Sequence, residues 1–258
     1  MQIGAQLYNL RDYCKTLPDL ADTLARVAAM GYKTVQLSGV CDYTPEWITE
    51  ELRKNGLTAD LTHYNAGRIA NDTAAVIAEH KGFNCKYIGI GSMPDFKKNG
   101  YKEEDYCKFV ERYLPAARMI RDAGCKFMYH NHNFEFYRFP DGRNVIERLC
   151  DDFTPDEMGF TLDTYWVTAA GGDPVDWLYR LRDRINCVHF KDMGYFAEEP
   201  HQRMTPIGSG NLNWPKIIET CNELGVEFAY IEQDHSYGED PFTCLEKGYA
   251  YLHSLGAI

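Results

Sequence analysis

Imidazole and carboxyl side chains recur in this chain directly after short apolar runs that are typical of buried strands. The residues concerned are His63, His130, His132, Glu135, Asp163, His189 and Glu232, and the amine of Lys191 occurs among them. Burying such groups without partners is costly, and a divalent metal ion removes that cost because it takes neutral imidazole and carboxylate as ligands. These residue types at the ends of successive strands therefore predict one metal centre.

Four of these residues are the expected ligands of one divalent ion, and sequence does not choose among Mn, Co, Zn, Fe and Mg. Asp163, His189 and Glu232 end three neighbouring predicted strands, so their side chains can converge on one point. His130 is the expected fourth ligand because it lies nearest the end of its own strand. Residues two apart in a strand share a face, so His132 can also point inward and could ligate in its place.

Other interpretations of the same residues stay open. Glu135 could contact the substrate or replace His130 as the ligand. Asp163 could cap the following helix, and His189 could be an ordinary core histidine. Glu232 could form a barrel ion pair with Lys191. A shared position at one end of the strands favours the metal centre over all of these explanations together.

The elements that must position these residues follow a regular rhythm. Gly31, Gly56, Gly82, Gly124 and Gly225 each follow an amphipathic segment, where glycine adopts the left-handed conformation that closes a helix. Strands are expected near 2–8, 33–38, 57–63, 85–91, 125–131, 158–163, 185–191 and 227–233. Eight strand–helix alternations in about 250 residues predict a single (β/α)8 TIM barrel, one domain over 1–258. An open doubly wound sheet is the alternative, but no Gly-x-Gly-x-x-Gly follows the first strand.

The segments between the strands carry further expectations. Helices are expected at 17–30, 103–123, 214–224 and 242–255, and another is expected to begin at Asp173-Pro174. The helix at 103–123 is expected to break near Pro115. The stretch 192–213 has no clear pattern, and a loop of this length is often a lid. His80 and His253 are expected at the surface of outer helices.

Composition limits the partners. Lys and Arg total 27 against 38 Asp and Glu, a net charge of −11 that disfavours nucleic acid and anionic membranes. Nine scattered cysteines without a Cys-x-x-Cys pair predict free thiols in a reducing compartment. No signal peptide or membrane span is recognised, so cytoplasm is the expected location. The expected partner is a small molecule.

Several motifs carry a resemblance to a known family. They are Ile3-Gly4-Ala5-Gln6-Leu7-Tyr8, Tyr129-His130-Asn131-His132-Asn133-Phe134-Glu135-Phe136, Thr161-Leu162-Asp163-Thr164, Val188-His189-Phe190-Lys191-Asp192, Gly208-Ser209-Gly210-Asn211-Leu212-Asn213-Trp214 and Ile231-Glu232-Gln233-Asp234. With them, nearly the whole chain resembles the sugar phosphate isomerase/epimerase superfamily with its xylose-isomerase-like barrel. That group includes ketose 3-epimerases, hydroxypyruvate isomerase and inosose dehydratase.

The resemblance implies a metal set of Glu, Asp, His and Glu on strands five to eight. Asp163, His189 and Glu232 match the last three positions. His130 stands where the family has the strand-five Glu, and Gln36 stands where it has a strand-two Glu. In the epimerases the glutamates of strands five and eight move protons on the two faces of an enediolate. The departure at His130 therefore points toward the dehydratase and keto-glycoside branch.

The chemistry that the resemblance implies is proton removal next to a carbonyl, through a metal-stabilised enediolate. The first expectation is a metal-dependent sugar isomerase or epimerase. Alternatives are a dehydratase or 3-keto-glycoside lyase on the same site, and a non-catalytic sugar-binding subunit. A DNA-repair endonuclease of this fold is disfavoured by the net charge.

Roles are assigned on that basis, for a sugar or keto-sugar substrate. The expected catalytic groups are Glu232, Lys191 and Glu135, with Glu232 also a metal ligand. The expected substrate contacts are His63, His132, Arg203 and Gln36. Barrels of this family often pair, so the resemblance also allows a homodimer.

Overall fold

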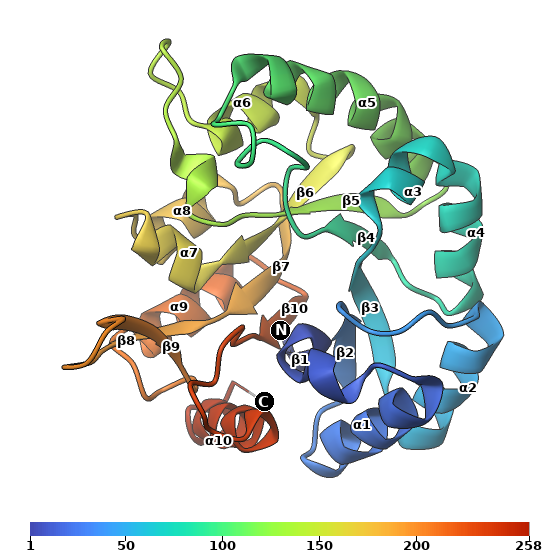
Figure 1. Cartoon of the computed structure of the whole chain (residues 1–258), viewed down its shortest axis with the longest axis vertical. Helices are drawn as coiled ribbons and strands as arrows, with labels where there is room; N and C mark the ends of the chain where they lie inside the picture. Colours follow the sequence, from blue (N-terminus) through green and yellow to red (C-terminus); the bar gives the residue numbers. More distant parts are fainter. Residues whose placement is uncertain (258) are drawn as a thin grey trace.

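Eight parallel strands close into a barrel in the order β1-β10-β7-β6-β5-β4-β3-β2 (Figure 1). The computed structural model describes residues 1–257. The barrel strands are β1 (Gln2–Gln6), β2 (Thr34–Leu37), β3 (Thr58–His63), β4 (Tyr87–Ile90), β5 (Lys126–His130), β6 (Met158–Asp163), β7 (Ile185–Phe190) and β10 (Phe228–Ile231). Each lies within one of the eight expected strand segments, so the predicted (β/α)8 TIM barrel is confirmed.

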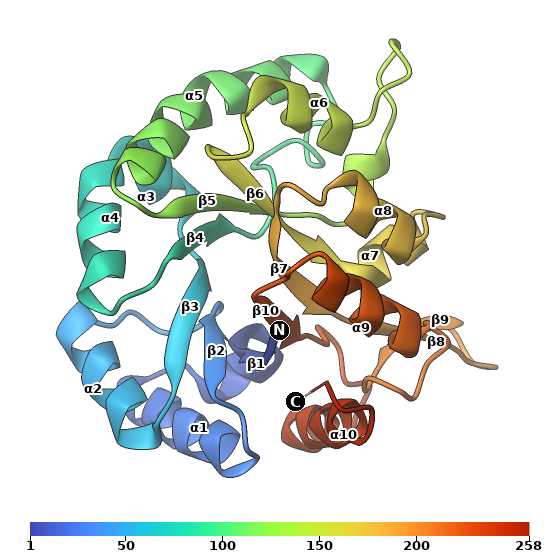
Figure 2. The ribbon, with the colours of Figure 1, turned by 180° about the vertical axis from the view of Figure 1, so that it is seen from behind.

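Helices form a ring outside the strands in both views (Figure 1, Figure 2). They are α1 (Leu17–Ala29), α2 (Pro45–Asn55), α3 (Ala66–Asn71), α4 (Thr73–Gly82), α5 (Glu103–Asp122), α6 (Val145–Asp152), α7 (Thr164–Ala169), α8 (Pro174–Arg180), α9 (Trp214–Glu223) and α10 (Pro241–Ser254), with the 3-10 turns η1 (Leu7–Tyr13) and η2 (Phe134–Phe136). Among residues 1–257, no helix is both long enough and apolar enough to cross a membrane.

Local sequence signals fix several helix ends. The Asp173 side chain accepts a hydrogen bond from Val175 N at the start of α8, as its position before Pro174 predicts. Gly56 ends α2 with a φ of 62°, in the left-handed conformation that glycine adopts without strain. Gly82 differs from the expectation because it still belongs to α4. The left-handed residue there is Asn84, with a φ of 59°.

Two expectations about the helices are wrong. Helix α5 runs through Pro115 without a break, because Pro115 lies on its exposed face, where water can bind the freed backbone carbonyl. His80 is fully buried, since α4 turns that side chain toward the barrel. Its Nδ1 lies 2.7 Å from Val76 O and its Nε2 lies 2.9 Å from Thr62 Oγ1, so both ring nitrogens have partners.

A layer of mostly apolar side chains fills part of the barrel interior. Leu61, Tyr87, Met128, Cys187 and Tyr230 pack against one another inside the ring of strands. Gly4 leaves room for this packing, because a Cβ there would lie 2.6 Å from the ring of Tyr230. Polar side chains lie on both sides of this layer. Lys126, Asn186 and Glu227 bond to one another at the amino ends of the strands, and the imidazoles and carboxylates expected to form the site lie at the carboxyl ends.

The long segment after β7 is not irregular as expected. It forms an antiparallel hairpin of β8 (Asp192–Tyr195) and β9 (Gln202–Thr205), which projects at the side of the barrel (Figure 1). The buried Asp192 carboxylate holds its base by accepting hydrogen bonds from the backbone N–H groups of Met193, Gly208, Gly210 and Leu212 and from Trp214 Nε1. One carboxylate therefore joins the base of the hairpin to the segment that follows it, up to Trp214.

We predict that Asp192→Asn lowers the free energy of unfolding by on the order of 3 kcal/mol. The amide nitrogen cannot accept a hydrogen bond, so buried N–H groups would face another donor. Urea unfolding followed by circular dichroism measures the loss. Asp183→Asn, which makes the same change at an exposed position, is the control, and equal stability of the two variants would refute the organising role of Asp192.

We also predict a pH dependence that belongs to His80. Burial lowers the pKa of His80 from 6.5 to about 4. Between these values the unfolded chain binds a proton that the folded chain does not, so stability falls as the pH drops from 7 to 4. Wild type should lose about 3 kcal/mol more than His80→Gln over this range. Parallel pH profiles of unfolding for the two proteins would contradict the prediction.

Candidate metal centre and active site

Four side chains from neighbouring strand ends meet at the open end of the barrel. They are His130 of β5, Asp163 of β6, His189 of β7 and Glu232, which directly follows β10. Each offers one potential ligand atom, and these atoms all lie within 4.8 Å of one another. None of the four residues is more than 4% exposed. The structure thus brings together the four residues expected from the sequence.

The strand ends are tied to one another by polar contacts. Asp163 and His189 are paired in the register of β6 and β7. Asn131 Oδ1 accepts from Asp163 N at 3.0 Å, and Thr164 Oγ1 donates to Lys191 O at 2.8 Å. These bonds fix the backbone from which the side chains project, which a preorganised site needs.

Three of the four converging groups present atoms without hydrogen-bond partners. Asp163 Oδ2, His189 Nδ1 and Glu232 Oε2 are buried and make no hydrogen bond of suitable geometry within residues 1–257, although the ammonium of Lys191 lies within 3.1 Å of both oxygens. His189 Nδ1 lies 2.8 Å from Glu232 Oε2 and 3.9 Å from Asp163 Oδ2. Buried atoms of this kind are normally satisfied, so their orientation toward one point fits a divalent cation.

Gln36 sets the orientation of His189. Its Oε1 lies 2.6 Å from His189 Nε2, and both side chains are fully buried. An amide oxygen can only accept, so Nε2 carries the proton and the lone pair of Nδ1 faces the carboxylates. Partners of this kind orient metal-binding histidines and raise their basicity. Gln36, expected to contact substrate, lies behind His189 and is not among the residues that line the cavity described below.

Lys191 balances part of the negative charge. Its Nζ lies 3.1 Å from Asp163 Oδ2, 3.0 Å from Glu232 Oε2 and 3.0 Å from Asp234 Oδ2. Three carboxylates against one ammonium leave a formal charge of minus two, which a divalent cation would neutralise. Burial raises the pKa of Asp163 to about 7, against the lowering effect of Lys191. Burial also acts to raise the pKa of Glu232, but Lys191 and His189 hold it well below its ordinary value.

A cavity of about 340 Å³ opens over the cluster. Its walls come from the loops after β1, β2, β4, β5 and β10 and from the end of β3. They are made by Tyr8, Arg11, Ser38, His63, Gly91, Ser92, His130, His132, Glu232, Asp234 and His235. A second cavity of about 270 Å³ continues past Ser38 and His63 toward Arg68 and Glu79. The space suits a small polar molecule in contact with His130 and Glu232.

A model of the xylose isomerase-like TIM barrel family matches residues 24–252. The chain belongs to this family. Curated relatives include an inosose dehydratase of Geobacillus kaustophilus, 25% identical over 93% of this chain and 90% of that protein. An inosose dehydratase of Lacticaseibacillus casei is 29% identical over 69% of this chain and 63% of that protein.

Solved structures share the fold of this xylose isomerase-like barrel. A sugar phosphate isomerase/epimerase of Parabacteroides distasonis superposes with a TM-score of 0.81 at 23% identity, covering 100% of this chain and 95% of that one. An L-ribulose 3-epimerase superposes with a TM-score of 0.73 at 14% identity, covering 99% and 94%. At these identities the likeness is one of fold.

Of the residues expected to contact substrate, some line the cavity of this barrel and others do not. His63 and His132 line the cavity, as expected. Arg203 lies on β9, where its guanidinium donates to the backbone oxygens of Glu198, Glu199 and Pro200. Arg203 is thus held at the tip of the hairpin and is not among the residues that line the cavity.

Glu135, expected to be catalytic, is fully buried beside the cavity. Its two carboxylate oxygens accept from Tyr129 Oη and from His132 N, each at 2.7 Å. Tyr129 Oη in turn accepts from Met93 N at 3.0 Å. Burial raises the pKa of Glu135 to about 7. This network ties the loops after β4 and β5 together, so Glu135 positions His132.

Two ordinary explanations coexist with the metal interpretation. Asp163 Oδ1 caps α7 by accepting from Trp166 N at 2.9 Å, while Oδ2 faces the cluster. Glu232 does lie against Lys191, as the ion-pair alternative requires. In both cases the side chain serves the fold, and its Oδ2 or Oε2 atom lies beside Lys191 and also faces the cluster.

Sequence reasoning missed the far wall of the cavity, formed by Tyr8, Arg11, Ser38, Ser92, Asp234 and His235. Arg11 donates to the backbone oxygens of Tyr8 and Asp234 and so joins the loops after β1 and β10. The available signal was Asp234, which follows Glu232 by two positions and therefore lies on the same side of an extended chain.

Proposed function

We propose that this chain is a divalent-metal-dependent enzyme that removes a proton next to the carbonyl of a polyhydroxy ketone and then eliminates water from it. The observation that carries the proposal is the convergence of His130, Asp163, His189 and Glu232, whose buried ligand atoms point at one spot below a cavity. The curated relatives named inosose dehydratase support elimination as the outcome.

The four converging residues would hold the metal, with Gln36 orienting His189 from behind. A bound divalent ion would supply a Lewis acid that polarises the carbonyl and lowers the barrier to losing the neighbouring proton. Lys191 lies behind the carboxylates and does not line the cavity, so its charge acts through Asp163 and Glu232.

Glu232 is the proposed base. It lines the cavity, and the nearby ammonium and imidazole keep it ionised. The carboxylate takes the proton from carbon, the C–H electrons form a double bond, and the C–O bond at the adjacent carbon breaks. The leaving hydroxide recovers the proton from Glu232 and departs as water, so one carboxyl group completes the step.

Isomerisation or epimerisation is the second candidate, because it begins with the same proton removal. An epimerase needs a second base on the opposite face of the substrate. Position 130 holds His, Glu135 is turned away, and the carboxylates among the described lining residues are Glu232 and Asp234. Asp234 would have to serve as that base although it is paired with Lys191, which favours elimination. A binding subunit without turnover is the third candidate.

We predict that the purified protein binds one divalent ion, and that Asp163→Asn with His189→Ala removes it. Losing two of four ligands leaves too few donors to hold the ion. Elemental analysis after loading with Mn²⁺, Co²⁺ or Zn²⁺ provides the measurement, with circular dichroism to verify folding. Glu135→Gln is the control, because Glu135 is as deeply buried but lies outside the cluster. Wild type that stays metal-free would overturn the proposal.

We predict next that a keto-cyclitol or keto-sugar incubated with the metal-loaded protein loses the mass of one water. Glu232→Gln should slow this reaction by a factor of about 10² to 10⁴, the usual contribution of a general base. Mass spectrometry and NMR of the product distinguish the candidates. A product of unchanged mass would establish isomerisation, and a bound but unchanged ligand would establish the binding subunit.

A further inference from the structure

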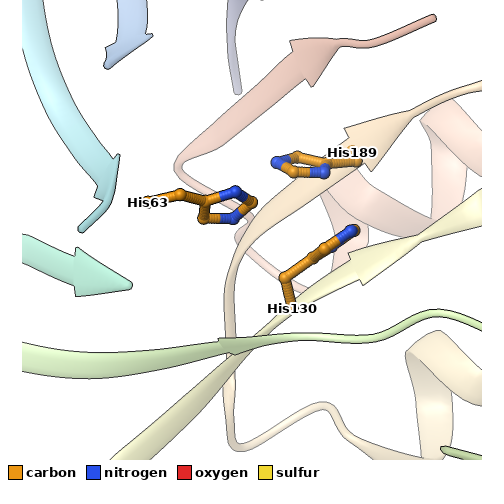
Figure 3. Close-up of side chains that lie close together, drawn as sticks. All are labelled: His63, His130 and His189. Atoms are coloured by element: carbon orange, nitrogen blue, oxygen red, sulfur yellow. The ribbon is translucent and has the colours of Figure 1, made fainter. Parts of the chain in front are cut away.

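A third imidazole faces the proposed metal centre from the opposite side. His63 at the end of β3 points toward His130 and His189 (Figure 3). The ring centroids of His63 lie 5.1 Å from His130 and 5.3 Å from His189, and those of His130 and His189 lie 4.5 Å apart. One nitrogen from each ring comes within 4.8 Å of the others. His130 and His189 thus belong both to the group of four candidate ligands and to a second group with His63.

The contacts of His63 leave a ring nitrogen free. Its Nε2 is buried without a hydrogen-bond partner within the described chain. Its Nδ1 lies 3.4 Å from Ser38 Oγ, a long contact for a hydrogen bond. A histidine placed only to fill the core would have both nitrogens satisfied, as His80 does. His132 Nδ1 is likewise buried without a partner, but His132 belongs to neither group of possible metal ligands, so among these two the nitrogen of His63 is the one placed to bind an ion with His130 and His189.

We propose that the metal ion has a second coordination position, held by His63, His130 and His189 through nitrogen alone. The inference rests on the proposed metal centre because both positions use His130 and His189. A nitrogen lone pair serves one ion at a time, so one ion moves between the positions. Imidazole-rich surroundings suit Zn²⁺, Co²⁺ and Fe²⁺, whereas Mg²⁺ and Mn²⁺ prefer oxygen. The second position thus makes the site selective for the nitrogen-preferring ions.

The two positions differ in whether the ion occupies the carboxylates of Asp163 and Glu232. In the four-residue position, the ion takes up the free oxygens of Asp163 and Glu232. In the three-imidazole position both carboxylates return to Lys191, which lies within 3.1 Å of each. Glu232 is then an unligated carboxylate beside the cavity, as a base must be. When the ion leaves the carboxylates, the positive charge of Lys191 still balances part of their negative charge, which lowers the electrostatic cost of the move.

The test compares metal affinities across variants rather than activity. His63→Gln removes the nitrogen ligand and keeps a polar side chain. His132→Gln is the matched control, because His132 also lies among these rings, 4.8 Å from His130, but belongs to neither group. Asp163→Asn reports on the four-residue position. Chelator competition gives the dissociation constants of Zn²⁺, Co²⁺ and Mn²⁺, and the visible spectrum of bound Co²⁺ reports its ligand set.

We expect His63→Gln to weaken Zn²⁺ and Co²⁺ binding by about tenfold or more, since even groups that only orient a ligand contribute 10- to 100-fold. Mn²⁺ binding should be unchanged, and the Co²⁺ spectrum should change in His63→Gln alone of the two histidine variants.

Equal losses for His63→Gln and His132→Gln, or equal losses for Zn²⁺ and Mn²⁺ in His63→Gln, would overturn the second position. If Asp163→Asn still weakened binding in that case, the four-residue centre would stand. Wild type that binds none of the three ions would overturn both proposals, so the two failures are distinguishable.

Discussion

The arrangement of this barrel depends on one electrostatic constraint, the burial of several carboxylates and imidazoles at a single point. Asp163, Glu232 and Asp234 carry more negative charge than Lys191 neutralises, and a low-dielectric interior magnifies every imbalance. The apolar layer of Leu61, Tyr87, Met128, Cys187 and Tyr230 separates these groups from the polar contacts at the amino ends of the strands. The bonds between strand ends hold them together in spite of their repulsion. The excess negative charge at the mouth is what the proposed cation would balance.

The fold and the convergence of the four candidate ligands could be predicted because both follow from strand periodicity. A residue at the end of a buried strand has a known direction, so His130, Asp163 and His189 were found together as expected. Arg203 lies on β9 and Glu135 in the 3-10 turn η2, both outside the barrel strands, so the direction of their side chains does not follow from the barrel. Arg203 turns to its own hairpin and Glu135 turns to Tyr129. No local pattern encodes these choices.

The environments of individual helix residues were also hard to predict from the sequence. The burial of His80 depends on how α4 is rotated against the barrel, and the hydrophobic pattern of that helix is too weak to fix the rotation. Pro115 is compatible with an unbroken α5 because its ring faces solvent. In both cases the residue type suggested one environment and the tertiary packing supplied another. The four candidate metal ligands escaped this difficulty because three of them belong to barrel strands and Glu232 directly follows one.

The Asp192 anchor has a consequence for how this scaffold can change. All five donors that bind its carboxylate lie at the base of the hairpin or in the segment behind it, and none comes from the turn between β8 and β9. The Asp192 bonds therefore hold the base of the hairpin and not its turn, and the contact from beside the turn to the loop after β10 is that of the Arg203 guanidinium over the ring of Tyr237, 5.3 Å from its centroid. Changes of length or sequence confined to the turn between β8 and β9 would leave all five Asp192 hydrogen bonds in place, so this segment is where the scaffold can vary most freely.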